Sequence, residues 1–426
     1  MWVPILFWYA INPYLSPDSY WYLTAAQAIR TNTWRENYVW NRTPGYPAFL
    51  AIAGPFAEVN YLYVITTFQI LITIFSLRAL SGILKEIKPN EAKNFKIERF
   101  FGAATILCFV FFGGYVSAIL QQSLIFNSLI WINIFLVKGF RKEFSTRKEL
   151  IILSFLIVIE FMIHPFCAVV LCIGYPFALL ARMKSNQSKL RMRKKMKISI
   201  FRVALSTTVL TITAVSWMFL STNAARDQVD VRSVDGVGNR AASYLVTDPN
   251  FIISVGLPLV RNPIERALST PKYMFENLID FPLQGPNIHI GFFRMFDTDK
   301  RCVVQPSEVI LHVSPGLLKE VPTNCWRSIN IQFEPAVGFA APLVYYLAYF
   351  LVFVLLAISI LGIYRSDYLL LIMYIPPLAF VLLYSILGAH ENRYGAPATA
   401  ILCLLGSYRL ARYRNESIEK HESFYE

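Results

Sequence analysis

Charged residues are scarce in this sequence and make up only 16% of its 426 residues. A soluble globular domain usually carries about a quarter. The shortfall is concentrated in long apolar runs, and hydrophobic residues account for 55% of the chain. A helix of about 20 apolar residues can cross a bilayer, because its backbone amides are all bonded internally. The composition therefore excludes an ordinary soluble domain and predicts a helical membrane protein.

Nine apolar runs are candidates for membrane spans. They occupy 59–84, 99–119, 120–138, 150–164, 165–182, 199–220, 339–364, 368–388 and 395–411. A further apolar segment at 1–11 has about half the required length, so this span is expected to be short or to begin upstream of Met1. Together these segments predict an all-α polytopic membrane protein with about ten transmembrane helices.

Cysteine is also scarce, with six residues that lack the spacing of a metal site. Four of them lie in apolar spans and are expected to be small core residues: Cys108, Cys167, Cys172 and Cys403. Cys302 and Cys325 fall in one predicted outer loop, where a disulfide could persist. Whether these two form a disulfide or remain unpaired thiols is open.

Acidic residues are outnumbered, which gives a net charge of +13. A basic face would indicate nucleic-acid binding. Here, however, the basic residues gather in alternate connections between spans, which is the pattern of cytoplasmic loops. These connections are 85–99, 138–148, 182–202 and 409–414. We therefore expect a plasma or inner membrane protein with no nucleic-acid partner. Its loops 12–58 and 221–338 lie outside, as do the turns near Gly113 and His390.

These features divide the chain into three parts. An N-terminal transmembrane module (1–220) contains the first outer loop (13–58), and a C-terminal part (339–426) contains the last helices and a basic cytoplasmic tail. Between the seventh and eighth spans, the extracytoplasmic loop 221–338 is too long for a mere connection. We expect it to fold into short helices and extended pieces. Turns are expected at Asp235-Gly236, Thr270-Pro271 and Gln284-Gly285-Pro286.

The first outer loop shows two helix starts. Ser16 suits the cap of a helix and Pro17 its first position. The following stretch, 20–29, mixes aromatic, apolar and polar residues, as in a helix that lies along the membrane interface. The sequence Thr-Pro-Gly-Tyr-Pro at 43–47 begins a second short helix in the same way. We therefore predict two interfacial helices joined by the segment 31–42.

Three polar elements on the predicted outer side resemble those of a known family. Asp18 follows the first span, Arg42 immediately precedes the Thr-Pro-Gly-Tyr-Pro motif, and His-Glu-Asn-Arg-Tyr at 390–394 forms the turn before the last span. In order, spacing and membrane side, they resemble the GT-C superfamily of membrane glycosyltransferases. The most similar branch contains the protein O-mannosyltransferases and the lipid A aminoarabinose transferases.

The resemblance implies transfer of a sugar from a polyprenyl-phosphate donor to a glycan, lipid or protein acceptor at the extracytoplasmic face. It implies a single inverting displacement with Asp18 as the general base. A guanidinium group binds phosphate through several donors at once, which suits Arg42 and Arg393 to the donor phosphate. The residues that the resemblance assigns to the donor phosphate and sugar are Arg42, Tyr46, His390, Glu391, Arg393 and Tyr394.

The chain departs from the family pattern at two places. Relatives often carry an acid at the outer start of the fourth span, where this chain has Gln121-Gln122. Relatives often have a basic residue in the fifth or sixth span, where this chain offers His164-Pro165. A divalent ion seeks six or more oxygen ligands, so Asp18 alone is a poor metal site. Metal dependence is therefore open, and the sequence indicates no other cofactor.

Each of these residues also has a structural interpretation. Asp18 could complement the dipole of its helix, and Arg42 could anchor the loop at the interface. Glu391 and Arg393 could pair with each other, and His390 could cap a helix end. These interpretations stand beside the catalytic one.

Glu160 and His164 lie one turn apart in a predicted span. Because charges are costly in lipid, both side chains are expected to face the protein interior. A buried hydrogen-bonded pair or a proton path would satisfy that requirement.

Two other functions fit a membrane protein of this kind. A transporter or flippase of a lipid-linked glycan would also use an apolar groove and interfacial arginines, but transporters usually show paired repeats, and none is visible here. A non-catalytic membrane scaffold would not require Asp18.

Overall fold

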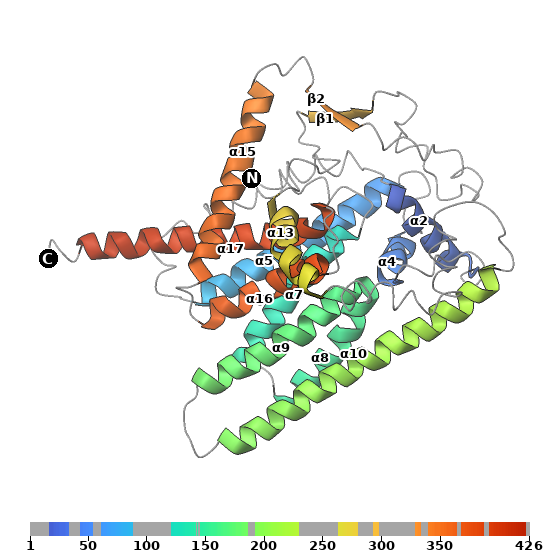
Figure 1. Cartoon of the computed structure of the whole chain (residues 1–426), viewed down its shortest axis with the longest axis horizontal. Helices are drawn as coiled ribbons and strands as arrows, with labels where there is room; N and C mark the ends of the chain where they lie inside the picture. The colour runs from blue at the N-terminus through green and yellow to red at the C-terminus, as the bar shows by residue number, and fades with distance from the viewer. Residues whose placement is uncertain are drawn as a thin grey trace.

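The computed structural model describes twelve stretches of the chain and one single residue between two of them. The stretches are 17–33, 43–53, 61–87, 121–141, 145–185, 192–229, 263–279, 293–297, 329–333, 340–363, 368–386 and 392–422, with residue 143 in addition. Almost all of this is helix (Figure 1). The exception is an antiparallel ribbon of β1 (Phe293–Asp297) and β2 (Ile329–Phe333), in which Phe293 lies opposite Phe333.

The helices follow the predicted order closely. They are α2 (Pro17–Arg30), α4 (Gly45–Ala53), α5 (Tyr61–Ile87), α7 (Gln122–Phe140), α8 (Thr146–Ile163), α9 (Pro165–Ser185), α10 (Met192–Val229), α13 (Pro263–Ile279), α15 (Ala340–Gly362), α16 (Tyr368–Ile386) and α17 (Asn392–Glu422). Each predicted span coincides with a helix except 99–119 and the segment 1–11, which lie outside the described residues. Helix α10 continues past the domain boundary predicted at 220.

Five helices within the described residues are long and apolar enough to cross a membrane. Their apolar segments are Val64–Lys85, Gln122–Phe140, Pro165–Met183, Ser199–Trp217 and Tyr368–Ile386. Large apolar side chains on these helices are exposed, among them Phe75 on α5 and Phe219 on α10. Apolar surface of this kind is unusual on a soluble monomer and suits contact with lipid. The chain is thus a helical protein suited to a membrane, and ten crossings remain a prediction.

Helix α7 occupies the centre of the bundle. It contacts α5, α9, α16 and α17, and most of its side chains are buried. Small residues allow the close approach of neighbouring helices. Gly406 on α17 packs against the backbone oxygen of Leu355 on α15, and Gly174 on α9 packs against Leu136 on α7. Cys167 and Cys403 are buried, Cys172 is half-buried, and all three are free thiols, as predicted; Cys108, Cys302 and Cys325 lie outside the described residues.

Helices α8 and α9 are separated at His164. The backbone of His164 is extended, with φ −159° and ψ 125°, because the ring of a following proline disfavours the helical conformation. Pro165 then takes the first position of α9, where its missing N–H costs nothing. The boundary predicted between 164 and 165 is therefore confirmed.

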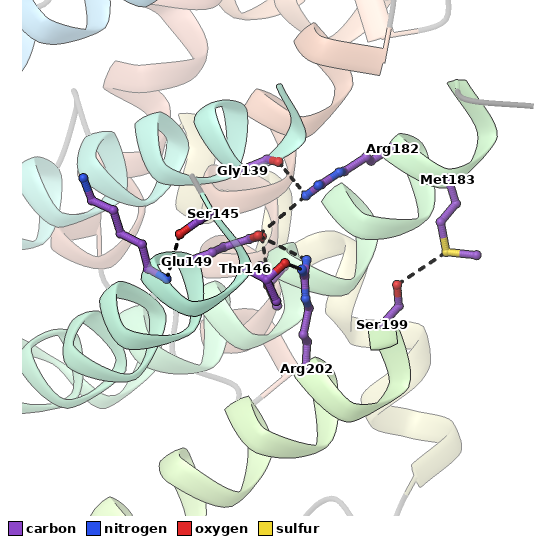
Figure 2. A network of polar contacts seen from close by, with 10 residues as sticks. Gly139, Ser145, Thr146, Glu149, Arg182, Met183, Ser199 and Arg202 are labelled. Carbon is purple, nitrogen blue, oxygen red and sulfur yellow. Dashed lines mark hydrogen bonds and ion pairs between the residues drawn. The ribbon is translucent and has the colours of Figure 1, made fainter. Parts of the chain in front are cut away.

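Four helix ends meet at the side of the bundle that carries the basic connections. Glu149, in the first turn of α8, is only 1% exposed at its side chain. Its carboxylate accepts hydrogen bonds from Tyr175 Oη of α9 at 3.0 Å and from Arg202 Nη1 of α10 at 3.1 Å. Figure 2 shows Arg182 reaching the same carboxylate from the end of α9, with Nη1 at 3.6 Å. Arg182 also donates to Gly139 O at the end of α7.

The turn predicted at Thr270-Pro271 is wrong, because Pro271 lies inside α13. A proline in a helix interior removes one backbone hydrogen bond and costs about 3 kcal/mol. The second half of α13 packs on α16 and α17, and this tertiary contact offsets the cost. The other expected turns, at 235–236 and 284–286, lie outside the described residues. Helix α13 and the β-ribbon agree with the prediction of short helices and extended pieces in the long loop.

Candidate functional site

Helices α2 and α4, which lie in the segment predicted as the first outer loop, form a unit of two packed helices. Helix α2 begins at Pro17, as predicted, and Asp18 is its second residue. Tyr22 and Leu23 of α2 pack with Tyr46 and Leu50 of α4 in one cluster, and the rings of Tyr22 and Tyr46 meet edge to face, 4.9 Å apart. The helix that carries Asp18 is therefore positioned by side-chain packing on α4.

Helix α4 is in turn fixed to the end of α8. Thr43 Oγ1 donates to Ile163 O at 3.1 Å. A Cβ atom at Gly45 would lie 2.6 Å from Met162 O, so only glycine allows this approach of two backbones. The threonine and glycine of the Thr-Pro-Gly-Tyr-Pro motif therefore have a structural role. They hold the two-helix unit against the junction of α8 and α9.

Tyr46 lies inside this unit. Its side chain is fully buried, and its hydroxyl donates to Gln69 Oε1 of α5 at 2.8 Å. In the structure, the Tyr46 ring therefore packs between α4 and its neighbours α2 and α5. A direct contact with a donor, as the resemblance implies, would require this ring to become exposed.

A ladder of polar side chains continues from Gln69 between α5 and α7. Thr73 Oγ1 donates to Gln69 O at 2.7 Å and accepts from Asn127 Nδ2 at 3.1 Å. One turn further along both helices, Trp131 Nε1 donates to Ser76 Oγ at 3.0 Å. Interhelical hydrogen bonds of this kind are worth about 0.6 kcal/mol on average in a membrane protein.

Several buried oxygens of α2 and α7 have no hydrogen-bond partner among the described residues. They are Gln27 Oε1 of α2 and, from the first two turns of α7, Gln122 Oε1, Ser123 Oγ and Asn127 Oδ1. Leu124 of α7 belongs to the cluster that holds α2 and α4, so the start of α7 borders the two-helix unit. These groups are neutral hydrogen-bonding atoms and suit hydroxyl groups as partners.

Gln121 and Gln122, which stand where relatives of the GT-C superfamily often have an acid, are both buried at the start of α7. Within the described residues, no group of three or more His, Cys, Asp or Glu side chains could hold a metal ion.

His164 joins the junction of α8 and α9 to α16. Its Nε2 lies 2.7 Å from Tyr384 Oη, and its Nδ1 accepts from the backbone N–H of Phe166 at 3.2 Å. Because Nδ1 accepts, a neutral ring carries its proton on Nε2 and donates to Tyr384. Glu160 is buried, and its backbone oxygen accepts from the backbone N–H of His164 at 2.8 Å. The expected pairing of the two side chains is corrected, because both ring nitrogens of His164 contact other groups.

Helix α13 of the long loop docks at the same end of the bundle. Asn277 Nδ2 donates to Ser385 Oγ at 3.1 Å, next to Tyr384 on α16. Thr399 Oγ1 of α17 donates to Leu278 O at 3.2 Å, and Gly395 packs directly on the backbone of Asn277. Figure 1 shows α13 lying across the ends of α16 and α17.

The residues predicted from sequence are described to different extents. Asp18 lies in the first turn of α2, and Arg393 and Tyr394 lie in the first turn of α17. Arg42, His390 and Glu391 lie outside the described residues. Their neighbours in the chain are linked by contacts that run from Thr43 through the junction at His164, then through α16 and α13, to Gly395.

Sequence reasoning missed two features of this region. The ladder could have been found, because Gln69, Thr73 and Ser76 recur at the spacing of one helix face in an otherwise apolar span. The hydrogen bond between His164 and Tyr384 could not be predicted from any local sequence pattern, because 220 positions separate the two residues.

In comparisons with family models, curated proteins and solved structures, nothing matches this chain. The resemblance to the GT-C superfamily therefore rests on the motif residues within 18–47 and 390–397.

Proposed function

We propose that this chain is a membrane glycosyltransferase that moves a sugar from a polyprenyl-phosphate donor to an acceptor at the outer face. One observation supports this most: the contacts that link Thr43, which follows Arg42, with the start of α17, where Arg393 is the second residue. These contacts favour a shared site for two motifs that lie far apart in the sequence.

The proposed reaction is a single displacement. The acceptor hydroxyl attacks the anomeric carbon, the bond from this carbon to the phosphate oxygen breaks, and polyprenyl phosphate leaves with the bonding electrons. Asp18 takes the proton from the acceptor hydroxyl. The leaving phosphate gains negative charge in the transition state, so Arg42 and Arg393 stabilise the transition state more than the bound donor.

The remaining residues complete the proposed donor site. His390, Glu391 and Tyr394 belong to the late motif and border the sugar and phosphate. The buried, unpartnered oxygens of Gln27 and Gln122 lie nearer the two-helix unit and suit sugar hydroxyls. The donor's isoprenoid tail needs an apolar surface, which the exposed apolar faces of the helices offer.

The test is sugar transfer by purified protein in liposomes that contain a radiolabelled polyprenyl-phosphate sugar and an acceptor fraction from the host membrane. Asp18→Asn keeps the shape of the side chain and removes its basicity. We expect transfer to fall by about 10²–10⁴-fold while donor binding is retained.

Glu265→Gln provides the matched control, because it removes an exposed carboxylate from α13 in the same outer part of the chain. This variant should transfer sugar normally. Near-normal transfer by Asp18→Asn would end the proposal. Movement of the lipid-linked sugar across the bilayer without any transfer would favour a flippase instead.

A further inference from the structure

Helix α13 has a surface that its docking does not use. The residues that pack against the bundle are Asn277 and Leu278, both buried, with Met274 half-buried beside them. Ile264, Leu268 and Phe275 are 75%, 76% and 61% exposed. These large side chains are spaced by four and seven residues, so they form one stripe along the helix.

Polar residues occupy another side of the same helix. Glu265 and Lys272 are exposed, and Lys272 Nζ lies 3.7 Å from Glu276 Oε1. With 3.6 residues per turn, the docked side, the apolar stripe and the polar side follow one another around α13. The docked side of α13 thus contacts the bundle, and the helix has two further sides, one apolar and one polar, that are exposed.

The docking contacts also show where α13 is attached along the length of the spanning helix α16. Asn277 bonds to Ser385, next to the end of the apolar segment Tyr368–Ile386. Leu382, one turn before Ser385 on α16, is an exposed apolar residue. The apolar outer surface of α16 therefore reaches the level at which α13 is attached.

We propose that α13 lies in the outer lipid–water interface, with Ile264, Leu268 and Phe275 inserted among lipid acyl chains. The occupant of the stripe is the bilayer, because α13 is attached beside Ser385, where the exposed apolar surface of a spanning helix ends. The Lys272–Glu276 pair then faces the headgroups. An amphipathic helix in this position typically sinks its apolar face about 5–10 Å into the boundary between headgroups and acyl chains.

This attachment concerns the long outer loop and does not depend on sugar transfer. A helix bound to lipid on one side and to α16 and α17 on the other holds its part of the loop at the membrane surface. Pro271 lies in the exposed part of α13 and so leaves the docked end intact.

Photocrosslinking in lipid nanodiscs tests the proposal. A benzophenone amino acid replaces Leu268 or Phe275 in the full chain, which is placed in phosphatidylcholine nanodiscs, irradiated and measured as intact protein by mass spectrometry. Lys272 is the matched control on the polar side of the same helix. Leu71, which is exposed on the spanning helix α5, is the positive control for lipid contact.

We expect lipid adducts at Leu268, Phe275 and Leu71, with yields at least several-fold higher than at Lys272. Equal yields at Lys272 and Leu268, or none at Leu268 while Leu71 reacts, would overturn the proposal. Crosslinks from Leu268 to another part of this chain or to a second copy would also overturn it. Because all four positions are exposed, the substitutions leave the core packing unchanged.

Discussion

The carboxylate of Glu149 lies 3.1 Å from Nη1 of Arg202, and both side chains are almost completely buried. The pair joins the first turn of α8 to α10, and Thr146 Oγ1 accepts a second hydrogen bond from the same guanidinium at 2.9 Å. A buried carboxylate of this kind is stable only with its partners in place, because desolvation of an unpaired charge costs several kcal/mol.

Removal of one partner of this pair should therefore destabilise the bundle strongly. We expect Arg202→Met to lower the free energy of unfolding by about 3–5 kcal/mol, because it leaves a buried carboxylate short of a counter-charge. Reversible unfolding in mixed micelles, followed by circular dichroism, measures the change.

Glu143→Gln is the control for this experiment. Glu143 pairs with Lys138 at 3.8 Å on the exposed connection between α7 and α8. An exposed pair contributes about 0–1 kcal/mol. If both variants lost the same small amount, the buried pair would not hold the helix ends together.

Gly45→Ala should loosen the two-helix unit. The added Cβ would meet Met162 O at 2.6 Å, and a backbone atom cannot move aside as a flexible side chain can. Overpacking of this kind typically costs about 1–3 kcal/mol. On the proposed function, transfer should also fall, since α4 positions the helix that carries Asp18.

Gly82→Ala on α5 is the matched substitution. Among the described residues, no atom outside the adjacent backbone of α5 lies within 4 Å of a Cβ at Gly82, so the change should stabilise the helix by about 0.5–1 kcal/mol. Thermal unfolding and sugar transfer are measured for both variants. Equal stability of the two would contradict the close approach of α4 and α8.

The hydrogen bond from Asn127 to Thr73 predicts a measurable coupling between α5 and α7. A double-mutant cycle with Asn127→Ala and Thr73→Val should give a coupling free energy of about 0.6 kcal/mol, the average for such bonds in a membrane protein. The single variants, the double variant and the parent are unfolded under the same conditions. A coupling of zero would mean that the two helices are held by packing alone.

The helices could be predicted because apolar runs and proline positions are local signals. Pro17 and Pro165 mark helix starts in the sequence, and the structure confirms both. Pro271 misled the prediction, because its helix is held by contacts with α16 and α17, which are distant in sequence.

The site was harder to predict than the helices. Asp18 and Tyr46 could be singled out from motifs, but a motif does not say whether a side chain is exposed. Tyr46 is buried against Gln69, which the motif alone does not indicate. The contacts of His164 depend on how α8, α9 and α16 pack, and no local pattern encodes that packing.

The proposed donor site makes a separate prediction about the two arginines. Phosphate contacts act in the bound donor as well as in the transition state, so Arg42→Ala and Arg393→Ala should raise the KM for the donor and also lower kcat. Asp18→Asn should lower kcat with little change in KM, because proton transfer occurs only in the chemical step. Steady-state transfer at varied donor concentration separates the two patterns.

Arg30→Ala is the control for the arginine variants, because Arg30 is an exposed residue of the same charge at the end of α2. If the outer loop attracts the donor only through its overall positive charge, the Arg30, Arg42 and Arg393 variants should weaken donor use equally. High salt should then abolish the difference between each variant and the parent, since exposed charges are screened beyond about 10 Å at 0.1 M salt.

A specific phosphate site predicts that Arg30→Ala retains normal kinetics and that the Arg42 and Arg393 defects persist in salt. Normal donor use by both Arg42→Ala and Arg393→Ala would remove the arginines from the proposed site.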